Sequence, residues 1–568
     1  MGSFEDFKQS LDAYLHAEQS LEKRDIEQTK QLTRAEKIAA GLMLPDLLVS
    51  EADGRTFVLY APDNYSKLRA GDKVLLKPQD GTSGIKALIV DTGMDTIAVS
   101  ANDALSREVV YDLEIESPNL LSSLIGCLEG IAPATPGAHF LRLLSGEEAV
   151  DNEDFLVLEP DTIGGFEKIF AGLNGKQQAA VRSMLRFHPI HILQGPPGTG
   201  KTQVLAATAI AASLKNREVV IVANTHQAVN NALLKIRQLD KNVPLFKIGE
   251  LLKAEELGDD IHKFGKFAEY NDFCRANRRR KRFGYVLGMT IWGAITHLGL
   301  RTHSHFRPYM AFVDEASLMP LTYASILGKC SSTICLFGDS RQMSPIFRKE
   351  LAGNALSESI LDYCAQKVEG TPIRILPETH RMNDEITAVV SRAFYEPYGI
   401  QLHSAKEVAA RRFQSSFFTR LGLADSVVFM ASDLSTPMCQ EENEGEANAV
   451  MNLLKRLLAE GNALNDIAVI TPFRKQVRLL RAKVHEICPE GRVPLIDTVE
   501  RLQGQDVNCI IITFAASAPT YIGEIRDFLF NHNRLNVMIS RAKTKVVIFG
   551  CQEVQDCLKT ILCKSAVI

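Results

Sequence analysis

The region beyond Leu173 contains eight short apolar runs, rich in valine and isoleucine, that do not alternate with polar residues. They are HILQG 191–195, VVIVANT 219–225, AFVDEA 311–316, TICLFGD 333–339, IAVITP 467–472, LIDTV 495–499, CIIITF 509–514 and VVIFG 546–550. Strands that are apolar on both faces are typical of parallel sheets covered by helices on each side. Helical stretches separate the runs, which fall into two groups divided near Thr371. The sequence therefore predicts an α/β fold with two parallel-sheet lobes.

The first 165 residues have a different pattern. Apolar residues recur at helical spacing from about Phe4 to Gly41, where glycine and then Pro45 end the pattern. Short Val/Ile/Leu segments separated by Gly, Asp and Pro follow, as in a small antiparallel barrel. We therefore expect an N-terminal stalk helix (1–45), a small β-barrel (46–120), a second stalk or linker (121–165), a first lobe (166–372, with an insertion at about 241–285) and a second lobe (373–568).

Composition limits the possible partners and cofactors. The 568 residues are 46% apolar and 23% charged, so a large buried core is expected. The 64 Lys and Arg residues are balanced by 68 Asp and Glu residues, so the chain has no overall positive charge. Contact with nucleic acid therefore depends on local basic clusters or on backbone amides. No run approaches the length of a membrane span, and the eleven cysteines form no C-x-x-C pair. We expect no membrane contact, no cysteine-held metal, and reduced thiols in a cytoplasmic protein, or a nuclear one if the source is eukaryotic.

Residues 195–202, GPPGTGKT, form the strongest local motif. They fit G-x-x-x-x-G-K-[ST], follow a predicted strand and open a predicted helix, which is the context that a phosphate-binding loop requires. Glycines let the loop curl so that several N–H groups and a helix N-terminus face an anion. The predicted nucleotide-binding residues are Gly195, Pro196, Pro197, Gly198, Thr199, Gly200, Lys201 and Thr202. Lys201 is expected to reach the β- and γ-phosphates, and Thr202 to ligate Mg²⁺.

A second acidic element follows the predicted strand at residues 311–313. Asp314 at the end of a strand can hold Mg²⁺ through water, and Glu315 can then orient and deprotonate an attacking water. An Asp-Glu pair after a strand is by itself more often a solvated turn. Downstream of a phosphate-binding loop it indicates phosphoryl transfer.

Six motifs occur in a recognisable order: GPPGTGKT 195–202, DEAS 314–317, GDSRQ 338–342, THRM 379–382, TVERLQGQD 498–506, and RLNV with SRAK within 534–543. This order resembles that of superfamily 1B helicases, in the branch with the nonsense-mediated-decay RNA helicase and the Okazaki-fragment nuclease-helicase. The segment NTHQAVNN 224–231 is especially similar to the second of these. The resemblance covers about residues 173–550 and implies two RecA-like lobes, preceded by a stalk and an accessory barrel.

The resemblance also implies roles for single residues, with ATP and Mg²⁺ as cofactors. The catalytic set becomes Lys201, Glu315, Gln342, Arg381 and Arg541, in which Gln342 senses the γ-phosphate and the arginines reach it from the second lobe. Arginine suits that role because its planar donors stabilise charge that develops in the transition state. Gln177 corresponds to the amide that recognises adenine, and Asp506 to an acidic residue near the ribose or a neighbouring motif. Phe473 corresponds to an aromatic that stacks on adenine; core packing is its equal alternative.

The chain departs from the family pattern in two places. Thr379 and His380 stand where the family usually has Gln-Tyr, and Asn533 replaces the first of two successive arginines. The arginines with assigned phosphate roles are present. The departures therefore bear on coupling strength and nucleotide preference more than on hydrolysis.

Candidates for contacting nucleic acid come from the same resemblance and from one basic cluster. The resemblance implies that Thr225 and Thr290 hold phosphates of a single strand without reading its sequence. Residues 275–282, RANRRRKR, form the dense basic cluster, and we hypothesise that Arg278, Arg279 and Arg280 contact the strand. A solvated helix face or a targeting tract is the alternative for this cluster. Trp292 is more often a buried anchor than a base-stacking platform.

The resemblance implies an ATP-dependent 5′→3′ helicase or translocase on a single strand, with DNA favoured over RNA. An RNA helicase of the same branch is one alternative, and an ATP-gated clamp or scaffold that does not unwind is another. Neither the length nor the cysteine pattern leaves room for the nuclease domain of the Okazaki-type relative. A nuclease is accordingly expected only as a separately encoded partner.

Overall fold

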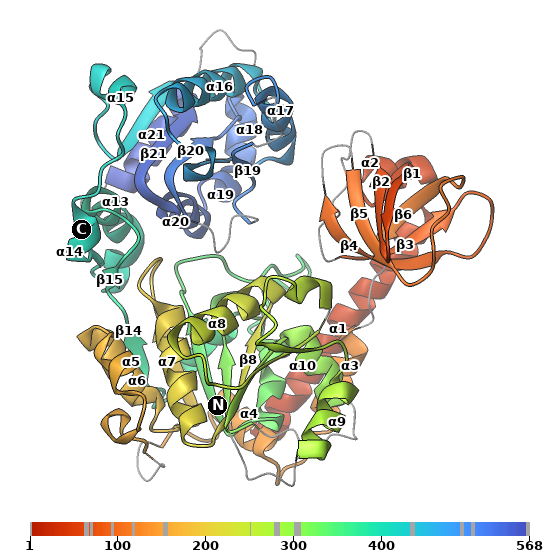
Figure 1. Ribbon diagram of the computed structural model, residues 1–568, viewed down its shortest axis with the longest axis vertical. Helices are drawn as coiled ribbons and strands as arrows, with labels where there is room; N and C mark the ends of the chain where they lie inside the picture. Colours follow the sequence, from red (N-terminus) through yellow and green to blue (C-terminus); the bar gives the residue numbers. More distant parts are fainter. Residues whose placement is uncertain are drawn as a thin grey trace.

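The computed structural model describes residues 3–61, 68, 72–92, 96–115, 120–151, 157–249, 251–277, 284–299, 308–431, 438–488, 493–500 and 506–563. Two α/β lobes lie one above the other in Figure 1, and a small barrel stands to one side on a helical stalk. This arrangement confirms the predicted fold class. No helix of the described ranges is long and apolar enough to cross a membrane.

The stalk begins with the long helix α1 (Phe4–Gln31), which Ser3 and Asp6 cap reciprocally. Its buried face, which includes Leu11 and Leu15, belongs to the same core cluster as α3 (Leu120–Glu129), α4 (Pro136–Ser145) and one face of the first-lobe sheet. The stalk is therefore part of the first lobe's packing, while its far end leads to α2 (Arg34–Ala39) and the barrel.

The barrel is closed and antiparallel, in the order β1-β2-β5-β4-β3-β6. Its strands are β1 (Met43–Asp53), β2 (Thr56–Tyr60), β3 (Lys73–Pro78), β4 (Ile85–Thr92), β5 (Thr96–Ala101) and β6 (Tyr111–Ile115). Buried and less buried residues alternate along β2, β3 and β5, as they must when one face of a strand fills a barrel interior.

The first lobe holds an eight-stranded sheet in the order β10-β9-β11-β8-β12-β13-β7-β14, and every neighbouring pair is parallel. The strands are β7 (Ile190–Gln194), β8 (Glu218–Ala223), β9 (Leu245–Ile248), β10 (His262–Phe264), β11 (Tyr285–Thr290), β12 (Met310–Val313), β13 (Thr333–Gly338) and β14 (Ile373–Ile375). The longer helices around it are α6 (Gly175–Met184), α7 (Lys201–Leu214), α8 (His226–Leu239), α9 (Phe267–Asn277), α10 (Ile291–Gly299) and α12 (Ile360–Lys367), and the shorter ones are α5 (Glu167–Ala171) and α11 (Leu321–Ala324). Separate apolar clusters cover the two faces of the sheet.

Two details of this lobe differ from the expectation. β14 belongs to this sheet but lies after residue 372, where we expected the first lobe to end. We did not predict it as a strand because its exposed Ile-Arg-Ile pattern does not resemble a buried parallel strand. The expected insertion at 241–285 also contributes strands to the sheet, since β9 and β10 extend it at the edge beyond β11. Strands of three or four residues are too short for a periodicity argument.

The second lobe has a five-stranded parallel sheet in the order β17-β21-β20-β18-β19. Its strands are β17 (Val427–Ala431), β18 (Ile467–Ile470), β19 (Leu495–Asp497), β20 (Val507–Thr513) and β21 (Ala542–Gly550). Its helices are α13 (Asp384–Val390), α14 (Lys406–Ala409), α15 (Ser416–Arg420), α16 (Glu444–Ala459), α17 (Arg474–Val484), α18 (Pro519–Glu524), α19 (Arg526–Leu529), α20 (His532–Ser540) and α21 (Gln552–Cys563). A π-helical turn, Ser391–Tyr395, follows α13, and the two-residue strands β15 (Glu378–Thr379) and β16 (His403–Ser404) pair beside it.

Candidate nucleotide-binding site

The loop at residues 195–200 joins the end of β7 to the start of α7 and has the conformation of an anion cradle. Gly198 and Gly200 take left-handed φ angles of 75° and 86°, which a residue with a Cβ adopts only at a cost. A Cβ on Gly195 would lie 2.4 Å from Cγ of Lys201. The Nζ of Lys201 donates a hydrogen bond to the Gly195 carbonyl, so the loop curls tightly around this side chain. The glycines leave the space in which backbone N–H groups can approach a phosphate.

Gln177 contacts this loop from α6. It is the third residue of α6, where it forms a capping box with Asn174, and its Oε1 accepts from the Asn174 N–H at 3.1 Å. Its Nε2 donates to the carbonyl oxygen of Thr199 at 3.1 Å. Gln177 is 5% exposed, although a glutamine at the start of a helix usually faces solvent.

Asp314 and Glu315 follow β12, two strands from β7 in the sheet. Burial, followed by repulsion from Glu315, raises the pKa of Asp314 to about 7, although the Glu315 N–H and Lys201 act in the opposite direction. Glu315 has a left-handed φ of 52°, a strained backbone of the kind that clusters at functional sites. Because carboxyl ends of parallel strands meet at one edge, these carboxylates lie beside the phosphate-binding loop.

A cavity of about 560 Å³ opens at this edge and is lined from both lobes. The first lobe contributes Gly172, Gln177, Pro197, Gly198, Thr199, Gly200, Lys201, Thr202, Gln203, Asn224, Thr225, Gln227, Ala228, Asn231, Lys235, Asp314, Glu315, Leu318 and Gln342, and the second contributes His380, Arg381 and Arg541. All five residues predicted to be catalytic line this cavity, although they come from separate motifs. They are Lys201, Glu315, Gln342, Arg381 and Arg541.

The two arginines of the second lobe lie close together, Arg541 buried and Arg381 partly buried, and their charges repel each other. Burial, and then the neighbouring Arg381, lowers the pKa of Arg541 to about 10; burial also lowers the pKa of Arg381. Arg381 donates from Nη1 to the Ser540 carbonyl at 3.1 Å, whereas Nε of Arg541 has no hydrogen-bond partner among the described residues. Two desolvated guanidinium groups on one cavity wall favour an anion with several oxygens.

Direct hydrogen bonds hold this wall against the loop. The His380 N–H donates to the Gly198 carbonyl at 2.9 Å, and Oγ1 of Thr379 donates to the Pro197 carbonyl at 2.8 Å. The departure Thr379-His380 from the family pattern thus lies at the contact between the lobes.

The remaining predicted residues take different places. Phe473 does not line the cavity: it is 6% exposed, and its ring centroid lies 6.3 Å from that of Tyr521 and 5.9 Å from that of Phe528. This placement favours the core-packing alternative. Asp506 forms an ion pair with Lys543 at 3.0 Å rather than lining the cavity.

The expected strand-contacting residues lie at the same edge of the first-lobe sheet: Thr225 follows the end of β8, and Thr290 ends the adjacent strand β11. Thr225 caps α8 by accepting from the Ala228 N–H at 3.2 Å, and Thr290 accepts from the Gly293 N–H at 3.2 Å. Trp292 is partly buried against the first-lobe core, and its ring packs edge-on to that of Tyr323 with centroids 5.0 Å apart. Arg278, Arg279 and Arg280 lie outside the described residues.

Sequence reasoning missed several residues around the cavity. Gln227, Asn231 and Lys235 line it from α8, and their spacing of four residues, which places them on one helix face, was the available signal. The buried residues Tyr395 and Asn536 reach Asp339 and Arg341 from the other lobe. Asn536 lies in the RLNV motif, but no spacing in the sequence connects either residue with Asp339.

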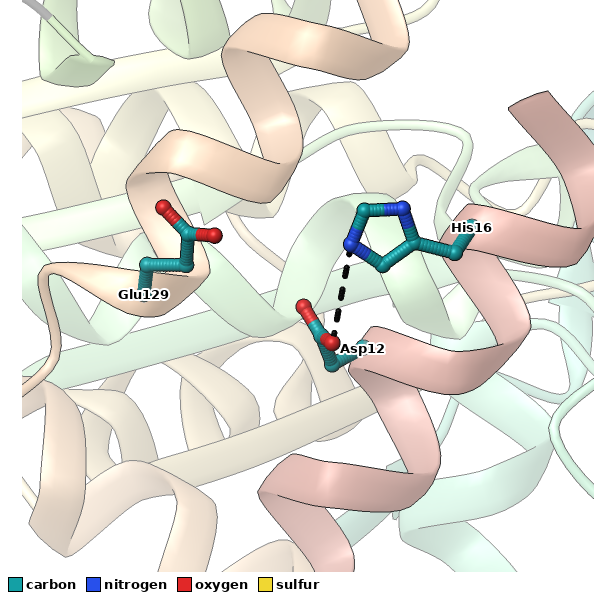
Figure 2. Close-up of side chains that lie close together, drawn as sticks. All are labelled: Asp12, His16 and Glu129. Atoms are coloured by element: carbon teal, nitrogen blue, oxygen red, sulfur yellow. Dashed lines mark ion pairs between the residues drawn. The ribbon is translucent and has the colours of Figure 1, made fainter.

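Away from the cavity, Asp12, His16 and Glu129 form a group that could in principle hold a metal ion (Figure 2). Asp12 and His16 lie one turn apart on α1, and Nε2 of His16 is 3.7 Å from Oδ2 of Asp12. Glu129 is the last residue of α3. His16 and Glu129 are exposed and Asp12 is only partly buried. Because an ordinary helix-surface ion pair explains their proximity, we assign this group no role.

The fold and the cavity define a P-loop protein with two RecA-like lobes and a candidate nucleotide site between them. Comparison with known proteins agrees: residues 172–364 and residues 356–553 each match a family model described as an AAA domain. In these matches the chain is similar to superfamily 1B helicases of the branch that the motifs indicated.

Three relatives illustrate the similarity. DNA replication ATP-dependent helicase/nuclease DNA2 of Xenopus laevis is 26% identical over 448 residues, which cover 72% of this chain and 40% of that protein. The Homo sapiens protein of the same name is 25% identical over 531 residues (87% and 48%). DNA polymerase alpha-associated DNA helicase A of Schizosaccharomyces pombe is 24% identical over 456 residues (69% and 66%). The chain spans less than half the length of these two DNA2 proteins.

Among solved structures, Arterivirus nonstructural protein 10 (helicase) superposes with a TM-score of 0.42 at 11% identity, covering 90% of this chain and 80% of that chain. The fold is defined by the strand orders of the chain itself, which give two parallel sheets and a closed barrel.

Proposed function

We propose that the protein is an ATP-driven motor that moves 5′→3′ along single-stranded nucleic acid, with DNA as its substrate. The observation that carries the proposal is one cavity in which Lys201 and Glu315 of the first lobe face Arg381 and Arg541 of the second. A site divided between two bodies can couple its contents to their relative position, because a ligand bound by both shifts the population toward closure.

The chemistry follows from the side chains in that cavity. The loop amides and Lys201 bind the triphosphate, and Glu315 accepts a proton from the attacking water. Arg381 and Arg541 stabilise the charge that develops on the γ-phosphate, and Gln342 lines the space between them and the loop. Glu315 and both arginines argue for turnover rather than for a clamp that only binds.

Thr202 and Asp314 are the residues that would hold Mg²⁺. The fit is supported by Asp314, a buried carboxyl whose pKa the adjacent Glu315 helps to raise, since such a carboxylate pair is stabilised by a divalent cation. When bound, the ion neutralises charge on the phosphates.

The choice of DNA is supported by the relatives, whose printed names describe DNA helicases. The nuclease in two of those names belongs to those proteins; for this chain we propose a nuclease only as a separate partner. We also propose a cytoplasmic compartment, or a nuclear one if the source is eukaryotic, which the ten described cysteines outside any disulfide support.

The test is ATP hydrolysis by the purified protein with poly-dT, with poly-U and without a strand. We expect poly-dT to stimulate more than poly-U, and Glu315→Gln to lower turnover by about 10² to 10⁴-fold. Glu129→Gln, a carboxylate on an exposed helix end, is the matched control and is expected to match the wild type. Turnover that survives Glu315→Gln would refute the proposed proton acceptor, and greater stimulation by poly-U would make RNA the substrate.

Unwinding is tested separately on duplexes with a single-stranded tail. We expect strand separation with 5′ tails and none with 3′ tails. Stimulated hydrolysis without strand separation on either substrate would leave a translocase or a clamp in place of a helicase.

A further inference from the structure

A continuous set of buried polar side chains crosses from the first lobe to the second beside the cavity. The first lobe contributes Gln194, Asp339 and Gln342, which are 7%, 1% and 8% exposed. The second lobe contributes Tyr395 and Asn536, both 0% exposed. Buried polar groups are costly unless they are hydrogen-bonded, so a set of this size calls for an explanation beyond packing.

Asp339, at the end of β13, is the centre of the set. One of its oxygens accepts from Nε2 of Gln194 at 2.7 Å and from the Arg341 N–H at 3.1 Å. The other accepts from Nε2 of Gln342 at 2.7 Å and from the hydroxyl of Tyr395 at 2.6 Å. The carboxylate thus fixes the cavity-lining Gln342, and Gln194 ties it to the strand that enters the phosphate-binding loop.

The second lobe reaches this carboxylate through one hydroxyl. The Tyr395 oxygen donates to Asp339 and accepts from Nδ2 of Asn536 at 2.8 Å. Asn536 lies on α20, which ends at Ser540, immediately before Arg541, and its Nδ2 also donates to the Arg341 carbonyl at 2.6 Å. The path from Gln342 to the helix that delivers Arg541 therefore runs through three side chains.

We infer that Tyr395 is a positioning residue for ATP hydrolysis, whose hydroxyl couples the setting of Gln342 in the first lobe to the position of Arg541 in the second. This inference rests on the proposed ATP-driven motor. The residue does not line the cavity, and the hydrogen bonds of its hydroxyl join it to Asp339 and Asn536.

Two features separate this role from packing. A phenylalanine would fill the same apolar surroundings without bringing a polar atom into the core, so the hydroxyl is what needs explaining. Burial and the neighbouring Asp339 raise the pKa of Tyr395, which keeps the hydroxyl protonated as a permanent donor. The residue also ends a π-helical turn, a local structure that is frequent at functional sites.

The test is Tyr395→Phe, which removes only the hydroxyl and leaves Asp339 its three other donors. Tyr363→Phe is the matched control, because the hydroxyl of Tyr363 donates at 2.8 Å to the Leu144 carbonyl, away from the contact between the lobes. A hydrogen bond to a buried charged group corresponds to about a 10- to 100-fold effect. We expect Tyr395→Phe to lower the poly-dT-stimulated kcat by that factor while KM for ATP changes less than about threefold, and Tyr363→Phe to leave both unchanged.

Asn536→Ala probes the same path from the other side and serves if Tyr395→Phe does not fold. If the two residues act as one path, the double variant loses no more kcat than the worse single variant. Stimulated kcat equal to that of Tyr363→Phe, or parallel losses in kcat, ATP affinity and thermal midpoint, would overturn the inference. A wild-type protein without strand-stimulated hydrolysis would instead refute the proposed function.

Discussion

The contact between the phosphate-binding loop and the second lobe gives the sharpest prediction, which concerns Gly198→Ala. Gly198 has a φ of 75°, and a Cβ built on it would lie 2.4 Å from Cβ of Arg381 and 2.7 Å from Oγ1 of Thr379. Ordinary contacts of a Cβ begin at 3.4 Å. The clashing atom is the Cβ of Arg381, which cannot move away by a change of side-chain rotamer. Arg381 therefore has to shift by about 1 Å, and a misplacement of that size costs about 100-fold in rate.

Backbone strain accompanies this clash and needs its own control. Gly165 has a similar φ of 85°, but a Cβ there would meet nothing within 4 Å. Gly165→Ala therefore carries only the left-handed strain, about 1–2 kcal/mol. The effect of Gly198→Ala on thermal midpoint is expected to be similar, while its effect on turnover is expected to exceed that of Gly165→Ala by about 100-fold.

The assay is steady-state ATP hydrolysis with saturating poly-dT, together with thermal unfolding of each variant. A double variant, Gly198→Ala with Arg381→Ala, tests the route of the effect. If the added methyl acts by displacing Arg381, the double variant is no slower than Arg381→Ala alone. Turnover of Gly198→Ala within about threefold of Gly165→Ala, or additive losses in the double variant, would refute the reasoning.

Two further predictions concern stability. His191 lies on β7 with neither ring nitrogen hydrogen-bonded within the described part of the chain, and burial, then repulsion from His188 and Arg374, lowers its pKa to about 3. Below about pH 6.5 this histidine is protonated in the unfolded chain but stays neutral in the folded chain. The free energy of unfolding therefore falls by up to about 1.4 kcal/mol per pH unit as the pH drops from 6.5. In urea unfolding at pH 7.5 and 5.0, His191→Leu should lose less stability between the two pH values than the wild type. An equal loss in the two proteins would contradict this prediction. In the barrel, burial alone would raise the pKa of Asp112, but the two-pronged bond from Arg34 at 2.8 and 2.9 Å, with other donors, lowers it overall. Asp112→Asn should destabilise the barrel by about 1–3 kcal/mol in proteolysis-monitored unfolding, with exposed Asp80→Asn as control, and equal effects of the two would count against this ion pair.

The sequence determined what depends on neighbours in the chain. The phosphate-binding loop needs a strand, glycines, Lys201 and Thr202 within a dozen residues, so its place and conformation follow from local order. The unbroken apolar runs likewise correspond to four of the eight strands of the first-lobe sheet and to four of the five strands of the second. Since parallel strands end at one edge, even the meeting of the loop with Asp314 follows from the pattern of strands.

Tertiary structure decided the features whose partners are distant in sequence. The sequence around Phe473 is the same whether its ring stacks on a base or packs against Tyr521 and Phe528, so only the tertiary packing favours one of the two. Tyr395 is 56 residues from Asp339 and 141 from Asn536, so no spacing rule connects them. A hydrogen bond is formed by position and not by residue type, and position across two lobes is set by the whole fold.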